Sequence, residues 1–77
     1  MRLHIHSLEK TIFDGSADVV SLPTETGVIS VLAGHTPLVT ALKKGNIEIK
    51  NGAEIQKFPI DSGFAQINHD SVIDLIN

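Results

Sequence analysis

The stretch NIEIKNGAEIQKFPI, residues 46–60, predicts a β-hairpin. Apolar and polar residues alternate in its first half, which is typical of a strand that buries one face. Asn51-Gly52 follows, and this dipeptide is the strongest short-range signal for a tight turn between two strands. The stretch therefore indicates two antiparallel strands that turn near its centre.

The register of this hairpin depends on the length of its turn. A two-residue turn at Asn51-Gly52 would place Ile49 opposite Glu54, and each face would then mix apolar and charged residues. A three-residue loop, 50–52, avoids this mixing and places Gly52 in the left-handed conformation that glycine adopts readily. We expect this second register, which gives two apolar pairs inside and two carboxylates outside: Ile47 with Ile55, Ile49 with Ala53, and Glu48 beside Glu54.

The second arm of the hairpin is less regular. Ile55 and Ile60 fall on opposite faces of a regular strand. A β-bulge near Lys57-Phe58, or burial of both faces, would reconcile them. Pro59 has no N–H to donate to a ladder, so we expect it at a sheet edge or at the bulge.

Five further segments show a strand pattern, and no segment shows helical periodicity over ten or more residues. The segments are Arg2–His6 with Leu3 and Ile5 inside, Asp18–Leu22 with Val20 and Leu22 on one face, Val28–Leu32, Phe64–Ile67 and Val72–Ile76. Turn residues separate them: Pro23 with Thr24–Gly27, Ala33-Gly34, Ser62-Gly63 and Asn68–Asp70. Short strands with closely spaced turns predict one all-β domain over residues 1–77, a small, flattened antiparallel β-sandwich.

The composition supports a small aliphatic core. Hydrophobic residues make up 42% of the chain, and only three residues, Phe13, Phe58 and Phe64, are aromatic. Ile, Val and Leu favour the half-buried surface of a sheet. A chain of 77 residues buries only about 60% of its unfolded surface, so we expect a small stability margin.

The charge pattern argues against nucleic-acid binding. Six Lys and Arg against nine Asp and Glu give a net charge of −3, and Lys43-Lys44 is the only adjacent basic pair. Phosphate binding requires clustered basic residues, and binding of single strands requires aromatic stacking platforms. Neither feature is present in this sequence.

The absence of cysteine and the short apolar runs argue against several other classes of protein. The chain has no cysteine, which excludes disulfides and cysteine zinc sites and fits a reducing compartment. The longest apolar run, 28–33, is too short to cross a bilayer, and residues 1–6 lack the apolar core of a signal peptide. The sequence predicts a soluble protein that reaches a membrane only through a partner.

Histidines offer one candidate metal site. His4 and His6 lie two residues apart on a predicted strand and therefore point to the same face. With His35 or His69 as a third ligand they could hold a metal ion. The alternative is that both belong to the solvated face of an edge strand, and we expect no metal.

No catalytic site is predicted. The chain contains neither of the glycine-rich phosphate motifs, Gly-x-x-x-x-Gly-Lys-Ser/Thr and Gly-x-Gly-x-x-Gly. Ser62, His35 and Asp61 could suggest a hydrolase, but adjacent strand residues point to opposite faces, and no Gly-x-Ser-x-Gly elbow is present. We therefore expect no enzyme activity, no cofactor and no small-molecule ligand.

Residues 26–42, TGVISVLAGHTPLVTAL, closely resemble the signature segment of ATP synthase epsilon subunits. In that family a turn with glycine leads through a short strand into Gly-His-x-Pro-Leu, here Gly34–Leu38. The resemblance covers essentially the whole chain through further segments in the same order: Leu3–Phe13 followed by a turn at Asp14-Gly15, Lys44-Gly45, Ser62-Gly63-Phe64 with Ile67, and Val72–Ile76.

The resemblance implies a non-catalytic rotor subunit at the foot of the central stalk of an F-type ATP synthase. Members of the family bind the gamma subunit and the membrane c ring, and they help to couple ion flow to ATP synthesis at the cytoplasmic face of the cell membrane. Thr24, Glu25, Thr26, Gly27 and Val28 match the loop that faces the c ring, and Gly34, His35, Thr36, Pro37 and Leu38 match the segment near gamma.

Several of these residues also have structural interpretations. Gly34 fits a positive φ, Pro37 a stiff turn, and Leu38 a core position. His35 fits a buried histidine bonded to the backbone. The turn at Glu25 is the stronger candidate for partner contact, because loops carry recognition more often than cores do.

The sequence departs from the family in two respects. Acidic residues often flank the turn glycine in the family, whereas this chain has Thr26 and Val28, with Glu25 one position earlier. Family members usually continue into a two-helix hairpin after the sandwich. We expect no such helical domain within residues 1–77, and both a naturally short subunit and a truncated one fit the sequence.

Three classes of function remain open: a coupling subunit of the rotor, a free-standing interaction module that uses its edge strands, and a metal-dependent enzyme. The first class predicts an exposed apolar patch on one face of the sandwich. A rotor subunit requires such a patch because it buries part of its surface against gamma.

Overall fold

The computed structural model describes all residues, 1–77, and contains nine β-strands and no helix. The strands are β1 Arg2–His6, β2 Thr11–Ser16, β3 Val19–Thr24, β4 Gly27–Leu32, β5 Leu38–Leu42, β6 Gly45–Asn51, β7 Glu54–Ile60, β8 Gly63–Ile67 and β9 Ser71–Ile76. The short strands and close turns expected from the sequence are confirmed.

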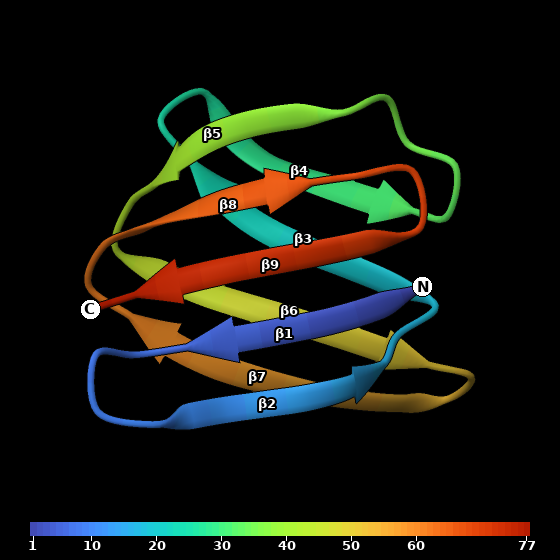
Figure 1. Cartoon of the computed structure of the whole chain (residues 1–77), viewed down its shortest axis with the longest axis horizontal. Helices are drawn as coiled ribbons and strands as arrows, with labels where there is room; N and C mark the ends of the chain where they lie inside the picture. The colour runs from blue at the N-terminus through green and yellow to red at the C-terminus, as the bar shows by residue number, and fades with distance from the viewer.

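The strands form one hydrogen-bonded path that curls into two layers (Figure 1). The path runs β2-β1-β9-β8-β5-β3-β6-β7, and β4 pairs with β3. Strands β2, β1, β9, β8 and β5 form the first layer, and β4, β3, β6 and β7 form the second. The backbone joins the layers at a single pairing, Thr24 with Leu42. The predicted β-sandwich is confirmed, and it measures 26 × 22 × 18 Å along its principal axes.

One pairing differs from the antiparallel arrangement that we predicted throughout. Strand β1 lies parallel to β9, with Leu3 opposite Val72 and Ile5 opposite Asp74. The first and last strands of the chain are joined in this way, and parallel neighbours require a long crossover connection. The remaining seven strands supply that connection, which a short-range sequence pattern does not reveal.

The core lies between the layers and consists of aliphatic side chains, as the composition predicted. Thirteen buried hydrophobic residues form one cluster. They are Leu3, Ile5, Ala17, Val20, Leu22, Val31, Leu42, Ile47, Ile49, Ile60, Ala65, Ile67 and Val72. The inward positions predicted for Leu3, Ile5, Val20 and Leu22 are confirmed, because all four are fully buried.

The predicted register of the β6–β7 hairpin is wrong. Ile47 lies opposite Phe58 and Ile49 opposite Gln56, and the two turn residues are Gly52 and Ala53. Gly52 has a φ of 60°, so its expected left-handed conformation is confirmed. A glycine with positive φ at the first turn position, followed by a residue with negative φ, is typical of a type II′ turn.

A tertiary contact explains this register. The side chain of Asn51 accepts a hydrogen bond from the N–H of Asp18 at 3.0 Å and donates one to the carbonyl of Ser16 at 2.9 Å. The N–H of Gly52 donates to the Asp18 carboxylate at 2.8 Å. Asn51 therefore ties the hairpin to the corner between β2 and β3 and stands in the strand instead of in the turn.

The second arm of the hairpin has no bulge, contrary to our expectation. Its pairing with β6 is continuous from Glu54 to Ile60. Ile60 points into the core, whereas Ile55 points outward and is 52% exposed, so burial of both faces is wrong as well. Strand β7 lies at one end of the path, which confirms the edge position predicted for Pro59.

Two strands end later in the chain than we predicted. Strand β2 continues through Asp14-Gly15 to Ser16, where we expected a turn, because these residues pair with β1. Strand β3 continues through Pro23, since its pairing with β6 ends at Ser21 and no ladder hydrogen bond is lost there. The Pro23 carbonyl instead accepts a hydrogen bond from the N–H of Lys43 at 2.9 Å.

Candidate functional site

The first candidate segment, Thr24–Val28, is the turn between β3 and β4, at the upper left of Figure 1. Glu25 and Thr26 form the exposed tip, and Val28 is 71% exposed. Thr24 is buried, and its hydroxyl donates to the Gly27 carbonyl at 2.6 Å. The turn therefore presents a carboxylate, a hydroxyl and an isopropyl group to solvent, while Thr24 holds its shape.

The second candidate segment, Gly34–Leu38, is the loop between β4 and β5. Gly34 has a φ of 85°, which confirms its expected positive φ, and its N–H donates to the His69 carbonyl at 2.6 Å. His35 is half-buried, and its Nδ1 donates to the Thr36 carbonyl at 2.6 Å. The loop is thus hydrogen-bonded to the turn between β8 and β9.

The structural interpretation of Leu38 as a core residue is wrong. Leu38 shares the inward side of β5 with Leu42, but it is the first residue of the strand and stands at the end of the sandwich. Its side chain is 43% exposed, and Thr36 and Pro37 beside it are also exposed. The loop therefore exposes apolar surface to solvent.

The two candidate segments do not form one site. Strand β4 runs from Gly27 to Leu32, so the turn lies at its start and the loop follows its end (Figure 1). The structure separates the two segments by the length of the sandwich. The two segments therefore cannot belong to one small contact surface.

The first layer carries an exposed apolar surface on its outer side. Phe64 of β8 lies opposite both Ala41 of β5 and Leu75 of β9. Phe64 is 61% exposed and Leu75 57% exposed, and Val39 points to the same side with 70% exposure. We call Leu8, Val39, Ala41, Phe64 and Leu75 the outer apolar face.

Leu8 extends the outer apolar face beyond the strands. It stands in the turn between β1 and β2, is 99% exposed, and lines an open groove with Phe64 and Leu75. The Ser7 hydroxyl accepts hydrogen bonds from the N–H groups of Glu9 and Lys10 and so holds this turn. The sequence predicted such a patch on one face but not its residues, which lie on three strands and a turn.

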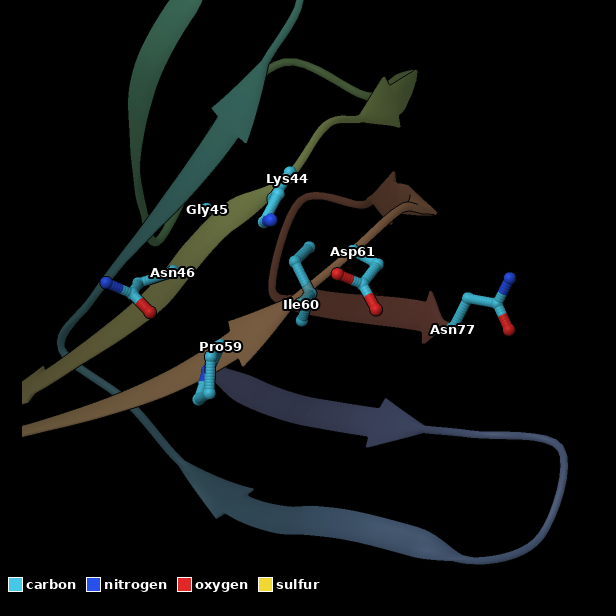
Figure 2. A pocket seen from close by; sticks show the side chains of 7 residues that line it. All are labelled: Lys44, Gly45, Asn46, Pro59, Ile60, Asp61 and Asn77. Carbon is cyan, nitrogen blue, oxygen red and sulfur yellow. The ribbon is translucent and has the colours of Figure 1, made fainter.

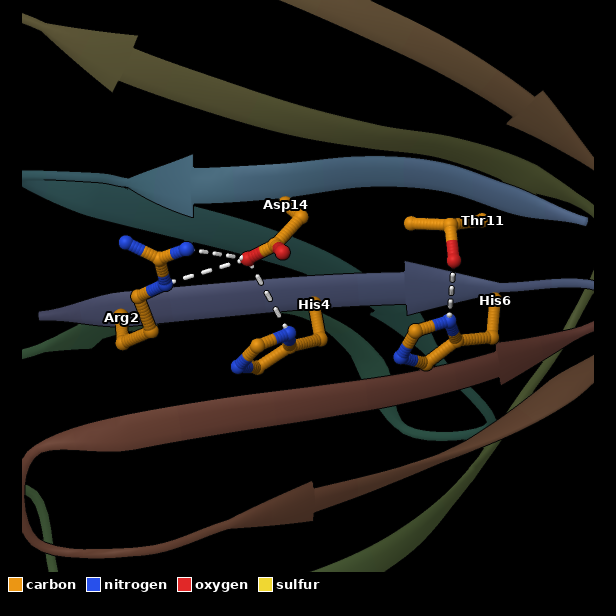
Figure 3. A network of polar contacts seen from close by, with 5 residues as sticks. All are labelled: Arg2, His4, His6, Thr11 and Asp14. Carbon is orange, nitrogen blue, oxygen red and sulfur yellow. Dashed lines mark hydrogen bonds and ion pairs between the residues drawn. The ribbon is translucent and has the colours of Figure 1, made fainter.

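A polar network borders the outer apolar face on β1 and β2 (Figure 3). Two nitrogens of Arg2 donate to one oxygen of Asp14, at 2.6 and 3.1 Å, and Nδ1 of His4 lies 3.2 Å from the same oxygen. His6 contacts the Thr11 hydroxyl at 3.1 Å and stacks on His4 with ring centroids 5.8 Å apart. The pairs are solvent-exposed, so each contributes at most about 1 kcal/mol.

The predicted third metal ligands lie away from this network. His35 belongs to the loop after β4 and His69 to the turn before β9, whereas His4 and His6 belong to β1. No group of three or more His, Cys, Asp or Glu side chains is placed to hold a metal ion.

A polar hollow lies where β6 begins and β7 ends (Figure 2). Lys44 and Asn46 line it around the start of β6, and Pro59 and Asp61 line it around the end of β7. Asn77 also lines it. The labelled side chains spread around the hollow and do not converge on one point. Small-molecule sites differ, because they enclose most of the ligand and aim a few polar groups at it.

Asp74 is the one buried acidic side chain, and the sequence analysis did not single it out. It is fully buried on β9, and neither of its carboxylate oxygens has a hydrogen-bond partner. Burial in apolar surroundings raises the pKa of Asp74 from 3.8 to about 7. The alternation of β9 could have revealed it, since Val72 and Asp74 fall on the same side of the strand.

Comparisons with known proteins identify a single family. The family described as "ATP synthase, Delta/Epsilon chain, beta-sandwich domain" matches residues 1–76. An ATP synthase epsilon chain of Synechococcus sp. (strain CC9311) is 35% identical over the whole chain. An ATP synthase epsilon chain of Cyanothece sp. (strain PCC 7425) is 38% identical over 69 residues, 90% of this chain.

Solved structures share the fold. The chain resembles one from the mitochondrial ATP synthase of Euglena gracilis, in an assembly of OSCP, F1 and c-ring, with a TM-score of 0.89 and 26% identity over 96% of this chain. It also resembles one from the central stalk and c-ring of the Tetrahymena thermophila mitochondrial ATP synthase, with a TM-score of 0.80 over 99% of this chain. The latter likeness, at 15% identity, concerns the fold alone.

The matched proteins are longer than this chain. The match covers 57% of the Synechococcus relative and 50% of the Cyanothece relative. It covers 48% of the Euglena chain and 62% of the Tetrahymena chain. The structure contains no helix with the length and hydrophobicity that a membrane span requires.

Proposed function

Because the chain belongs to the family of ATP synthase delta/epsilon chain β-sandwich domains, we propose that it is a non-catalytic rotor subunit in the central stalk of an F-type ATP synthase. In this role it binds the gamma subunit and the membrane c ring and helps to couple ion translocation to ATP synthesis. It lies at the cytoplasmic face of the membrane as part of that complex and uses no cofactor. The names of its relatives and the ATP synthase assembly of OSCP, F1 and c-ring that contains its Euglena neighbour support this proposal.

The outer apolar face is the observation that carries the proposal. Phe64, Leu75 and Val39 are each more than half exposed. Phe64 lies opposite Leu75, and Val39 stands two residues before Ala41, the other partner of Phe64. An exposed aromatic and aliphatic surface on a small soluble domain is typical of a protein–protein interface. A domain that works only within a larger assembly has a reason to keep such a surface.

We assign gamma binding to Gly34, His35, Thr36, Pro37 and Leu38. The positive φ of Gly34 and the two hydrogen bonds to His69 and Thr36 hold this loop in one shape. Leu38 is followed directly by Val39, so the loop adjoins the outer apolar face along β5. A partner that covers both would bury aliphatic and aromatic side chains, which dominate the energetics of interfaces.

We assign c-ring contact to Thr24, Glu25, Thr26, Gly27 and Val28. Their turn lies at the other end of β4 from the gamma-binding loop. This placement lets one rigid domain touch two partners at once. Glu25 supplies the charge at the tip of the turn, and Thr24 keeps the turn in shape through its hydrogen bond to Gly27.

Binding to gamma tests the outer apolar face. We expect saturable one-to-one binding of the chain to a purified gamma subunit, measured by calorimetric titration. Phe64→Glu is expected to weaken this binding by roughly 30-fold or more, because it places a charge at the centre of an apolar interface. Phe64 is 61% exposed, so the fold should tolerate the change.

Ile55→Glu is the matched control, since Ile55 is 52% exposed on the second layer. It should leave the affinity for gamma unchanged. Equal affinity of the wild type and Phe64→Glu would place gamma elsewhere on the domain. Absence of any binding at high micromolar concentration would contradict the assignment as a gamma-binding subunit.

The turn is tested by reversing its charge. Glu25→Lys is expected to leave gamma binding intact but to reduce ATP-driven ion pumping by the reassembled enzyme roughly two- to fivefold, the effect of losing an exposed charged contact. Glu54→Lys makes the same change in the β6–β7 hairpin and should leave pumping unaltered. Unchanged pumping by Glu25→Lys would remove this turn from the c-ring contact.

A further inference from the structure

Asp74 has no role in the partner contacts proposed above, and its surroundings are apolar. It lies opposite Ile5 of β1 and Ala65 of β8, and both of these residues are fully buried. Its carboxylate oxygens have no hydrogen-bond partner. A buried carboxylate without a partner is costly, so the group avoids its charged form while it remains inside.

No other titratable group is buried with Asp74. The inward side chains of its own layer are Leu3 and Ile5 on β1, Ala65 and Ile67 on β8, and Leu42 on β5. The facing layer contributes Val20 and Leu22 from β3, Val31 from β4, Ile47 and Ile49 from β6, and Ile60 from β7. The charged side chains of these strands and of β2 are not buried: Arg2, His4, His6, Asp14, Glu48, Lys50, Glu54 and Lys57.

On one side the two layers meet mainly through side chains, and backbone hydrogen bonds join them only at the strand ends, from Asp18 to Lys50 and from Asp61 to Asn77. Strands β2 and β7 are the two ends of the hydrogen-bonded path, so no ladder joins them. On this side Phe13 of β2 meets Phe58 of β7 edge to face, with centroids 5.9 Å apart. We call this contact the Phe13–Phe58 seam. On the other side the pairing of Thr24 with Leu42 joins the layers.

One cross-strand row connects the seam to the buried acid. Phe13 lies opposite Ile5, and Ile5 lies opposite Asp74. Asp74 is therefore two strands from the seam. Water that enters between β2 and β7 would reach its carboxylate before it reached the joined side of the sandwich.

We propose that Asp74 is a proton-binding site inside the sandwich, and that loss of its proton opens the two layers at the Phe13–Phe58 seam. The ligand is a proton taken from solvent, and the protein responds by hydrating the carboxylate. The joined side at Thr24 and Leu42 acts as the hinge. This inference concerns the isolated fold and holds whether or not the domain serves in a rotor.

The direction of the pH dependence follows from burial. The pKa of Asp74 is raised to about 7 in the folded protein, against 3.8 for the ordinary group. The folded state therefore holds the proton more tightly than the unfolded state, and stability falls as the pH rises from about 4 to about 7. Above that range both states are ionised and the loss is complete, up to roughly a thousandfold in the unfolding equilibrium constant.

Amide hydrogen exchange on the full chain tests the proposal, with Asp74→Asn as the variant. Asparagine has a similar shape and carries no charge at any pH in the range. Because the wild type and Asp74→Asn are compared at the same pH, the intrinsic dependence of the exchange rate on pH cancels. Opening at the seam lets water reach the inward face of β1, β2 and β9, so that their ladder hydrogen bonds break more often. Above pH 7 we therefore expect hydrogen-bonded amides of these strands to exchange about tenfold or more faster in the wild type than in Asp74→Asn, and below about pH 4 we expect equal rates.

Asp70→Asn is the matched control, because Asp70 is exposed in the turn before β9. It should follow the wild type at every pH. If Asp74→Asn does not fold, Asp74→Val replaces it in the same comparison. A carbon NMR titration of the Asp74 carboxyl gives its pKa independently.

Two outcomes would overturn the proposal. Titration of the Asp74 carboxyl near pH 4 would show that it is already hydrated in the folded state. Acceleration of β3, β4 and β6 amides to the same extent as those of β1, β2 and β9 would show global unfolding instead of opening at the seam. Faster exchange confined to β1, β2 and β9 would support it.

Discussion

Gly63→Ala is expected to destabilise the domain by about 3 kcal/mol or more, enough to leave much of it unfolded at 37 °C. A Cβ at this position would collide with the backbone carbonyl of Leu75 and would lie 3.1 Å from the Cα of Ile76. Both obstacles are backbone atoms of the paired strand β9, so they cannot turn aside as a side chain does. Urea denaturation followed by circular dichroism measures the loss.

Gly15→Ala is the control for this change. Gly15 also lies in a strand, but its added Cβ would meet only the ring of Phe13, at 3.3 Å. The ring can shift, so we expect a change within about 1 kcal/mol. A stable Gly63→Ala protein would show that β8 and β9 can separate locally, contrary to the close approach seen here.

Asp74→Val is expected to have the opposite effect and to raise the free energy of unfolding by about 2–4 kcal/mol at pH 7.5. The substitution removes the buried carboxylate, whose pKa of about 7 means that it is largely ionised at this pH. Valine packs against Ile5 and Ala65 without a polar group. In a domain of this size the melting temperature should rise by roughly 10 °C or more.

The same measurement at pH 5 provides an internal check. Most of the Asp74 carboxyl is protonated there, so the gain from valine should be smaller than at pH 7.5. Asp70→Val, at an exposed turn position, should change stability by no more than about 0.5 kcal/mol at either pH. Destabilisation by Asp74→Val would mean that the carboxyl has a stabilising partner.

The sequence indicated that Gly63 belongs to a family motif, and the structure explains why this residue is a glycine. Ser62-Gly63-Phe64 marked the family, and the pattern alone offered no reason for the glycine. The structure supplies one, because Gly63 lies opposite Ile76 where β9 comes too close for a side chain. Its neighbour Phe64 points outward to the outer apolar face.

Local patterns predicted some features of the candidate sites and missed others. Glu25 and Val28 were expected at an exposed turn, and they lie there. The alternative interpretation of Leu38 as a core residue was wrong, because Leu38 stands at the end of the sandwich and is 43% exposed. The outer apolar face combines residues from β5, β8, β9 and a distant turn, and no single segment of the sequence displays it.

The sequence by itself determined the all-β class, the approximate strands, the inward positions of Leu3, Ile5, Val20 and Leu22, and the family. These properties depend on alternation and turn residues, which act over a few neighbours. Tertiary structure alone decided the parallel pairing of β1 with β9, the register of the β6–β7 hairpin and the burial of Asp74. Each of these depends on residues far apart in the chain, as when Asn51 bonds to Ser16 and Asp18 and thereby moves the turn to Gly52-Ala53.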